Sequence, residues 1–440
     1  MTNQDLEAIA ADAKRVLSQN DDGLWTIPAK GVYQHQWLWD SCFTAIGLRH
    51  IDPDRAAQEL RSLFRGQWTN GMIPHMIFSP QPHRIDDSHL WSSRISPHAP
   101  QDVATSGITQ PPVIATALLA VAEKLPKEKS MSLLRELYPK LVSYHNWLYT
   151  ERDPHNEGLL MVFHPWETGL DNAPAWQIEL QSIHKPHWIT LLKTLKLTGL
   201  SLAFRRDTKN LPGDTRIDTA TALKFAHAAM ALKKRNYDPE KIIADPHFIA
   251  YSLSFNSIAL AANTALKQIA TKLGEKLPSS LEQKFSLAEK NFDNLYDEQT
   301  KMYQHYSFHT NERISTPSIS NLLPLYSGAV SKQRAAEIVA TLTSKPFWTK
   351  YPVPSVPTNS PYYDADRFWL GPTWINTNWL LIQGLRRYGY DKEANHIKRS
   401  SLELVQHSGM REYFSPEQGT GLGAEDFSWT AALVYDLLSE

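Results

Sequence analysis

Two carboxylates, Glu167 and Asp171, lie between two tryptophans, Trp166 and Trp176, in one short segment of the sequence. A carboxyl group packed against indole rings loses solvation, which raises its pKa into the range that suits a general acid. Asp171 is the better candidate, because Gly169 gives the backbone the freedom to aim its side chain. Glu167 is the competitor, and a simple loop cap is the structural alternative for Asp171.

A third carboxylate, Glu412, precedes two aromatic residues and a loop with glycines at 419, 421 and 423. An acid that protonates a leaving group needs a base on the opposite side of the substrate to activate water. Glu412 fits that role, because it comes from a distant part of the chain. Glu425 and Asp426 follow in the same loop and are its rivals. The glycines do not form a phosphate-binding loop, since no Lys-Ser/Thr pair follows them.

Aromatic and amide side chains that could bind a sugar gather in four further segments. Indole rings stack on the apolar faces of sugar rings and donate an N–H, and this chain has 14 tryptophans. Core packing, helix caps and turns are the structural alternatives for each segment. The candidates are Tyr33, Trp37, Trp39, Asp40, Gln67, Trp68, Gln110, Trp369 and Trp374, with Trp166 from the segment already described.

Composition narrows the class of protein. Lysine and arginine number 45 against 46 aspartates and glutamates, without a long basic run, which argues against nucleic-acid binding. The single cysteine, Cys42, rules out a disulfide within the chain and a thiolate metal site, and His184 and His187 have no suitably spaced acidic partner. We therefore expect no metal and no cofactor. The sequence also shows no signal peptide and no membrane span, so we expect a cytoplasmic protein, with a homo-oligomer possible.

Helical periodicity dominates the chain and predicts an all-α fold of about twelve helices. No βαβ alternation occurs, and the short alternating runs at 72–78 and 159–163 favour small hairpins. We expect one domain over 1–440, with long loops near 67–111 and 345–372 that carry function. Helices with such loops are typical of an (α/α)6 toroid with a pocket at one end, although periodicity alone gives only the all-α class. The expected helices lie near 4–19, 39–50, 53–65, 112–124, 130–151, 187–203, 218–234, 247–273, 280–296, 331–343, 372–388, 391–407 and 427–438.

Taken together, these segments resemble glycoside hydrolase family 63, and most closely its short bacterial glucosylglycerate and mannosylglycerate hydrolases. The resemblance spans roughly residues 30–180 and 355–438, through runs such as Trp37-Leu38-Trp39-Asp40 and Glu412-Tyr413-Phe414. It implies an (α/α)6 toroid and an inverting mechanism, with Asp171 as the general acid and Glu412 as the general base. The subsite for the glycosyl ring would be lined by Tyr33, Trp37, Trp39, Asp40, Gln110, Trp166 and Trp374.

One departure from the family concerns the aglycone, the part of the substrate that leaves the sugar. Glycerate-releasing members bind the glycerate carboxylate with an Arg-Pro-x-Asp-x-x-Tyr run, but residues 211–217 here read Leu-Pro-Gly-Asp-Thr-Arg-Ile. Arg205, Arg206 or Arg216 could replace the missing arginine, although arginine geometry is not freely portable.

The sequence thus predicts an inverting α-glycosidase for a small α-glucoside or α-mannoside, either glucosylglycerate-like or neutral. One alternative is a sugar epimerase or isomerase on a similar toroid, which would need a pair of histidines near the pocket. Another is a non-catalytic sugar-binding protein, in which the two carboxylates would not matter for function.

Overall fold

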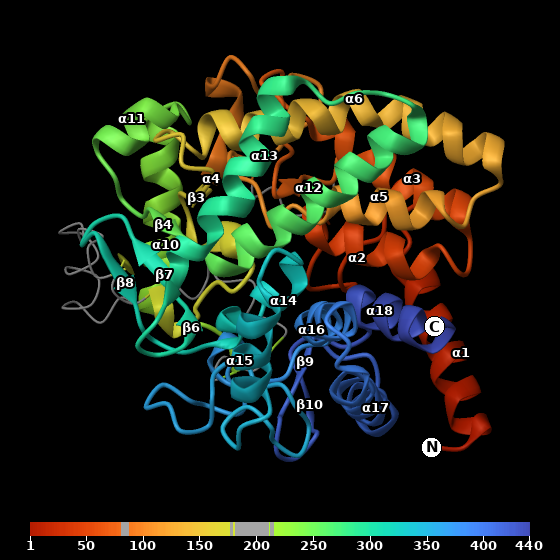
Figure 1. Cartoon of the computed structure of the whole chain (residues 1–440). Helices are drawn as coiled ribbons and strands as arrows, with labels where there is room; N and C mark the ends of the chain where they lie inside the picture. The colour runs from red at the N-terminus through yellow and green to blue at the C-terminus, as the bar shows by residue number, and fades with distance from the viewer. Residues whose placement is uncertain (81–87, 177–178, 181–210, 212–214) are drawn as a thin grey trace, which may run out of the picture.

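The structure, a computed structural model, describes residues 1–80, 88–176, 179–180, 211 and 215–440 (Figure 1). It is mostly helical, as predicted, and the strands within these ranges are only two or three residues long. None of the helices in the described ranges combines the length and the apolar character that crossing a bilayer requires.

Six helices form the centre of the molecule, and each contacts the next until the last meets the first. They are largely buried; all eleven residues of the first are buried, as expected for a helix that is apolar on every side. The first and last pack so closely that a Cβ on Gly47 would lie 2.3 Å from the backbone of Ala432. The six are α2 (Leu38–Leu48), α5 (Ile114–Ala122), α12 (Leu253–Leu273), α14 (Pro324–Ser327), α16 (Ile375–Arg387) and α18 (Ser428–Ser439).

Six further helices alternate with these along the chain. Their buried residues lie mainly on one apolar face of each helix. The first of them packs on α18, so the helices at the two chain ends lie side by side (Figure 1). Others pack on α2, α5, α12 and α16. Side chains cap the starts of three of them, at Thr2, Asp52 and Ser331, and Asp52 precedes Pro53 at the first helical position as predicted. The six are α1 (Asn3–Gln19), α3 (Pro53–Leu63), α6 (Lys127–Glu151), α13 (Ser279–Asn291), α15 (Lys332–Leu342) and α17 (Asp391–Ser408).

The remaining elements connect these helices. Within the described ranges, three more α-helices are α4 (Ser88–Trp91), α10 (Thr219–Lys234) and α11 (Pro239–Ala244). Single 3-10 turns lie at Phe64–Gly66, Ser93–Ile95, Pro165–Thr168, Pro174–Trp176, Phe292–Leu295, Ile319–Asn321 and Phe368–Leu370. The strands are β1 (Gln36–Trp37), β2 (Met76–Ile77), β3 (Met161–Val162), β4 (Ala250–Tyr251), β5 (Tyr296–Asp297), β6 (Met302–Tyr303), β7 (His305–Ser307), β8 (Glu312–Ile314), β9 (Tyr413–Phe414) and β10 (Gly421–Leu422).

The two predicted local hairpins were wrong. The strand at Met76–Ile77 pairs with β1, and the strand at Met161–Val162 pairs with β4, within a sheet of order β3-β4-β7-β8. Both alternating runs therefore join loops that are distant in the sequence. The predicted helix over 247–273 begins later, because β4 comes first and Ser252 caps the helix. The predicted helix over 187–203 lies outside the described residues, and the four-residue α14 was not predicted.

The N-terminal ends of three central helices, α2, α5 and α12, contact the loops of the predicted site. The backbone N–H of Trp39, in the first turn of α2, donates to Gln110 Oε1 at 3.3 Å, just before α5. The Ser254 hydroxyl of α12 donates to the carbonyl of Thr168, which lies in the loop that carries Asp171. These contacts bring together the loops that hold the predicted site residues.

Candidate active site

Glu412 is buried and lies in the short segment between α17 and β9. The Arg216 Nη1 lies 3.0 Å from both carboxylate oxygens, and the Tyr33 hydroxyl donates to Oε1 at 2.8 Å. The backbone N–H of Ala424 donates to Oε2 at 2.9 Å. Gly423 fits against this carboxylate, since a Cβ there would lie 2.5 Å from Oε2. The predicted base is therefore a carboxylate held firmly in an ion pair.

Arg216 contacts Glu412 directly, a position that the sequence did not indicate. It is buried just before α10, and its Nη2 donates to the Tyr33 hydroxyl at 2.5 Å. Its guanidinium also lies over the Phe368 ring, 4.2 Å from the centroid. The contact with Glu412 joins residues 196 positions apart, so no local pattern could have indicated it.

The surroundings of Asp171 raise the pKa of its carboxyl group, as a general acid requires. Its side chain keeps some contact with solvent, but burial raises its pKa from 3.8 to about 7. The positive charge of Arg216 lowers this pKa, and the negative charge of Glu412 raises it. Asp171 and Glu412 are thus close enough for electrostatic coupling. An acid with a pKa of about 7 is largely protonated in mildly acidic solution and can donate a proton near neutrality.

Asp40 adds a third carboxylate to this group. It lies in the first turn of α2, whose N-cap is Trp37, so the helix cap considered for Asp40 is not its role. Burial raises its pKa well above the ordinary value, and the charges of Glu412 and Asp171 raise it further. Repulsion among the three groups, together with burial, favours the protonated forms of Asp40 and Asp171.

One aromatic wall of the site begins at Tyr33. The Trp37 ring meets Tyr33 edge-on at 6.0 Å and His75 at 4.8 Å. His75 in turn stacks on Trp166 at 6.1 Å, which places the tryptophan that precedes Asp171 in the same wall. The indole N–H of Trp37 is buried, and no hydrogen-bond partner for it is present among the described residues. Such a donor suits a sugar hydroxyl.

A second wall joins Trp39 to the predicted pair near residue 370. Trp369 and Trp374 stack with centroids 3.8 Å apart. Trp374 lies 5.8 Å from Trp429, and Trp429 meets Trp39 edge-on at 5.4 Å. The backbone N–H of Trp369 donates to Asn172, which ties this wall to the loop of Asp171. Trp429 belongs to the Phe427-Ser428-Trp429 run of the sequence, but local sequence did not distinguish it from a core residue.

Gly169 allows the loop of Asp171 to approach this second wall. Its φ of +73° favours glycine, and a Cβ would lie 2.5 Å from the Trp39 ring. Gln110 is buried beside the same tryptophan and accepts its backbone N–H. Both predicted residues therefore lie next to the site.

Glu167, the competitor of Asp171, makes contacts that stabilise the fold. Glu167 is fully buried in an ion pair with Arg152 at 2.5 Å. It also accepts hydrogen bonds from the backbone N–H groups of Thr109 and Phe163. These contacts join α6, the 3-10 turn at 165–168 and the segment before α5, so Glu167 braces the loop that carries Asp171.

The rivals of Glu412 face solvent. The Glu425 side chain is 75% exposed and pairs with Arg411. Asp426 is 43% exposed and pairs with Arg15 of α1. Neither has the desolvated environment of Glu412, whose side chain is 3% exposed.

Gln67 and Trp68 have structural contacts. The Gln67 amide donates to the carbonyls of Gly71 and Lys140, and the buried Trp68 donates from its indole N–H to Thr105. These bonds fix the turn before β2. A role for both residues in sugar binding stays a prediction.

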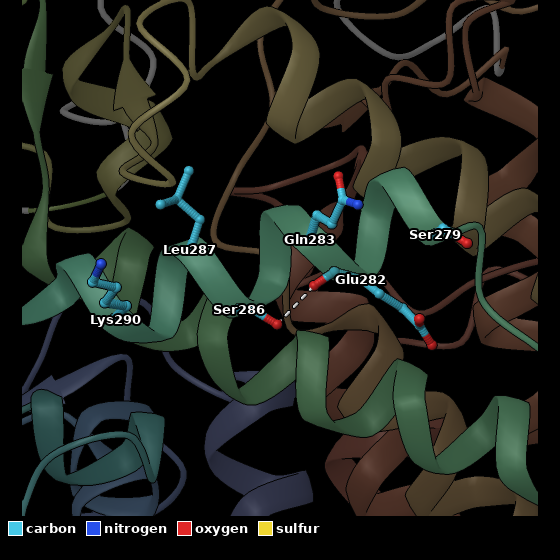
Figure 2. Close-up of a pocket in the computed structure, with 6 residues that line it drawn as sticks. All are labelled: Ser279, Glu282, Gln283, Ser286, Leu287 and Lys290. Atoms are coloured by element: carbon cyan, nitrogen blue, oxygen red, sulfur yellow. Dashed lines mark hydrogen bonds between the residues drawn. The ribbon is translucent and has the colours of Figure 1, made fainter.

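The rest of the molecule matters here for metal binding, for the remaining predicted residues and for a further pocket. No group of three or more His, Cys, Asp or Glu side chains in the described ranges could hold a metal ion. His184, His187, Arg205 and Arg206 lie outside those ranges. A separate open pocket follows α13, and Figure 2 shows that its lining side chains all project from that helix. They are Ser279, Glu282, Gln283, Ser286, Leu287 and Lys290.

The arrangement fits cleavage of a bond between a sugar and its substituent. Indole walls suit the sugar ring, a carboxyl with a pKa of about 7 suits protonation of a departing oxygen, and a second carboxylate suits activation of water. Fold and site together define a glycoside hydrolase.

The chain belongs to glycoside hydrolase family 63, because the profile of the mannosylglycerate hydrolase MGH1-like glycoside hydrolase domain matches residues 33–430. It is similar to mannosylglycerate hydrolase from Rubrobacter radiotolerans, with 36% identity over 99% of this chain and 98% of the relative. Glucosylglycerate hydrolase from Mycolicibacterium hassiacum is 28% identical over 98% and 97% of the two chains. The crystal structure of a mannosylglycerate hydrolase from Thermus thermophilus, in complex with Tris and D-glycerate, superposes with a TM-score of 0.88 at 34% identity, covering 97% and 99%.

Proposed function

We propose that the protein is an inverting α-glycosidase in which Asp171 is the general acid and Glu412 the general base. The observation that carries this proposal is the pair of environments: burial raises the pKa of Asp171 to about 7, while Glu412 is held as a carboxylate by Arg216. Two carboxyl groups in contrasting environments are the usual basis of an acid and base assignment. Family membership favours this reading over an epimerase or a non-catalytic binding protein.

The proposed reaction is a single displacement at the anomeric carbon. Asp171 gives its proton to the glycosidic oxygen as the bond from that oxygen to the anomeric carbon breaks. Water attacks the same carbon from the opposite face, and its proton goes to Glu412. The positive charge that develops on the ring is stabilised by the negative charge of Glu412. We expect the acid and base carboxyls to be about 6.5–9.5 Å apart, which leaves room for the water.

We propose that the twelve alternating helices form an (α/α)6 toroid in one domain over 1–440. The closed succession of contacts from α2 through α18 supports an inner ring of six. The hydrogen bonds at the N-terminal ends of α2, α5 and α12 support a pocket there, where Asp171 and Glu412 are coupled.

We propose a small α-mannoside or α-glucoside with a glycerate-type aglycone as substrate. Relatives named mannosylglycerate and glucosylglycerate hydrolases support this class, as does the D-glycerate complex of the Thermus protein. In this chain Arg216 provides a buried cation beside the acid and the base. A neutral glucoside is the alternative, because the family's carboxylate-binding run is altered at residues 211–217.

The test is sugar release from a panel of α-mannosides and α-glucosides, with and without a glycerate group. We expect turnover of at least one glycerate-bearing substrate. Asp171→Asn and Glu412→Gln should each lower kcat by about a hundredfold or more, the scale of a lost acid or base. Glu425→Gln is the matched control, because that side chain is exposed and outside the site. Full activity of either catalytic variant, or no release from any substrate, would refute the proposal.

A further inference from the structure

The carboxylate of Glu412, the proposed base, has no free lone pair for a further hydrogen bond in this structure. An ionised carboxylate offers about four lone-pair sites, two on each oxygen. Oε1 of Glu412 accepts from Arg216 and Tyr33, and Oε2 accepts from Arg216 and the N–H of Ala424. All four sites are therefore occupied by protein donors. A base must accept a proton from water, so one of these donors has to withdraw before the reaction.

Two of the three donors are poorly placed to withdraw. The Ala424 N–H is held in place by its own backbone, because the Glu412 N–H donates to the Ala424 carbonyl at 2.9 Å. Tyr33 is wedged edge-on between Trp37 and Phe427. Arg216 alone among them has a long side chain whose charged end can rotate while its backbone stays in place.

The backbone around Arg216 is fixed from two sides. The Tyr413 hydroxyl donates to the carbonyl of Thr215 at 2.9 Å, and Arg367 Nε donates to the carbonyl of Arg216 at 3.2 Å. Tyr413 follows Glu412 directly, so arginine and base keep a constant backbone separation. A movement that breaks their ion pair is therefore a rotation of the guanidinium.

We propose that Arg216 is a specificity-determining residue: a carboxylate on the aglycone takes its guanidinium from Glu412 and so frees the base for water. This inference rests on the proposed function and deepens it. Guanidinium binds carboxylates through charge-assisted hydrogen bonds, so a substrate carboxylate can replace the bond to Glu412 at little net loss. A neutral aglycone offers no such replacement, and Arg216 stays on the base.

The same rotation favours the acid. The positive charge of Arg216 lowers the pKa of Asp171, so moving that charge away lets the pKa rise and keeps the proton in place. An anionic aglycone thus prepares both catalytic groups. Discrimination against neutral substrates should consequently appear in kcat, because a neutral substrate can bind the glycosyl subsite and still meet a blocked base.

The experiment compares a glycerate-linked substrate with its carboxamide, which has the same shape without the charge. For the wild-type enzyme, kcat should be about ten- to a hundredfold higher for the carboxylate, the range that one charge-assisted hydrogen bond supplies. In Arg216→Gln this ratio should fall to within about threefold. Arg411→Gln is the matched control: this neighbouring arginine pairs with exposed Glu425 and should keep the wild-type ratio.

A second measurement needs no variant. The wild-type enzyme is given an α-glycosyl fluoride of the sugar it accepts, whose leaving group requires no general acid, with and without added D-glycerate. The free carboxylate should raise kcat about tenfold if one charge-assisted bond is exchanged. A carboxylate preference found in KM alone, a ratio unchanged by Arg216→Gln, or no response to D-glycerate would overturn the inference and leave the proposed function standing. No hydrolysis of any substrate would refute the proposed function, and the inference with it.

Discussion

Replacing Asp171 by asparagine should make the stability of the protein less dependent on pH. The carboxyl has an ordinary pKa of 3.8, which applies to the unfolded chain, and a pKa of about 7 in the folded protein. Because the folded state holds the proton more tightly, this group's contribution to stability is complete below about pH 4. It is lost as the pH rises to about 7. Asparagine has no proton to lose, so the variant escapes this loss.

The size of the effect follows from the two pKa values. The difference between 3.8 and about 7 corresponds to roughly 4 kcal/mol, at about 1.4 kcal/mol for each factor of ten. Residual solvent contact of the side chain reduces that figure. We expect the variant to gain about 2–4 kcal/mol over the wild type between pH 4 and pH 8.

The assay is urea unfolding of both proteins at a series of pH values, with the difference in unfolding free energy plotted against pH. Asp54→Asn is the control, because that side chain is 63% exposed and its ion pair with Lys129 lies at the surface, where such pairs contribute little. A difference between the Asp171 variant and the wild type that stays flat from pH 4 to pH 8 would refute the account of Asp171.

Three further predictions concern activity and packing. Measured kcat/KM should fall as the pH rises through about 7, because the general acid loses its proton there; a profile flat from pH 6 to pH 9 would contradict this. Gly423→Ala should lower kcat by about a hundredfold, since its Cβ would lie 2.5 Å from Glu412 Oε2 and displace the base. Gly409→Ala, with the same sign of φ but open space around it, should keep wild-type kcat, and equal losses in both variants would argue against displacement. Glu167→Gln should lower the free energy of unfolding by about 3–5 kcal/mol, because Arg152 stays buried without its charge partner; urea unfolding measures this, and a loss below 1 kcal/mol would be inconsistent with it.

The sequence predicts those features whose physical cause is local. Helical periodicity located most of the helices, because each must bury one apolar face or all of them. Asp171 could be singled out because its tryptophan neighbour and Gly169 lie within five residues of it, and the structure places Gly169 against the Trp39 ring.

Features that depend on distant contacts could not be predicted in this way. Arg216 forms its ion pair with Glu412, which lies 196 positions further along the chain. Trp429 makes its edge-on contact with Trp39, which lies near the other end of the chain. The four-residue α14 is only about one helical turn long, so no repeat of hydrophobic spacing can indicate it. Short alternating runs indicate a strand but not its partner, which is why β2 was expected in a hairpin and instead pairs with β1.

The most direct test of inversion at the Asp171 and Glu412 pair is the anomeric form of the sugar first released from an α-linked substrate. Proton NMR spectra recorded in the first minutes, before the free sugar equilibrates, distinguish the two anomers. The account predicts that the β-anomer accumulates first and that the α-anomer grows in later. Early accumulation of the α-anomer would contradict it.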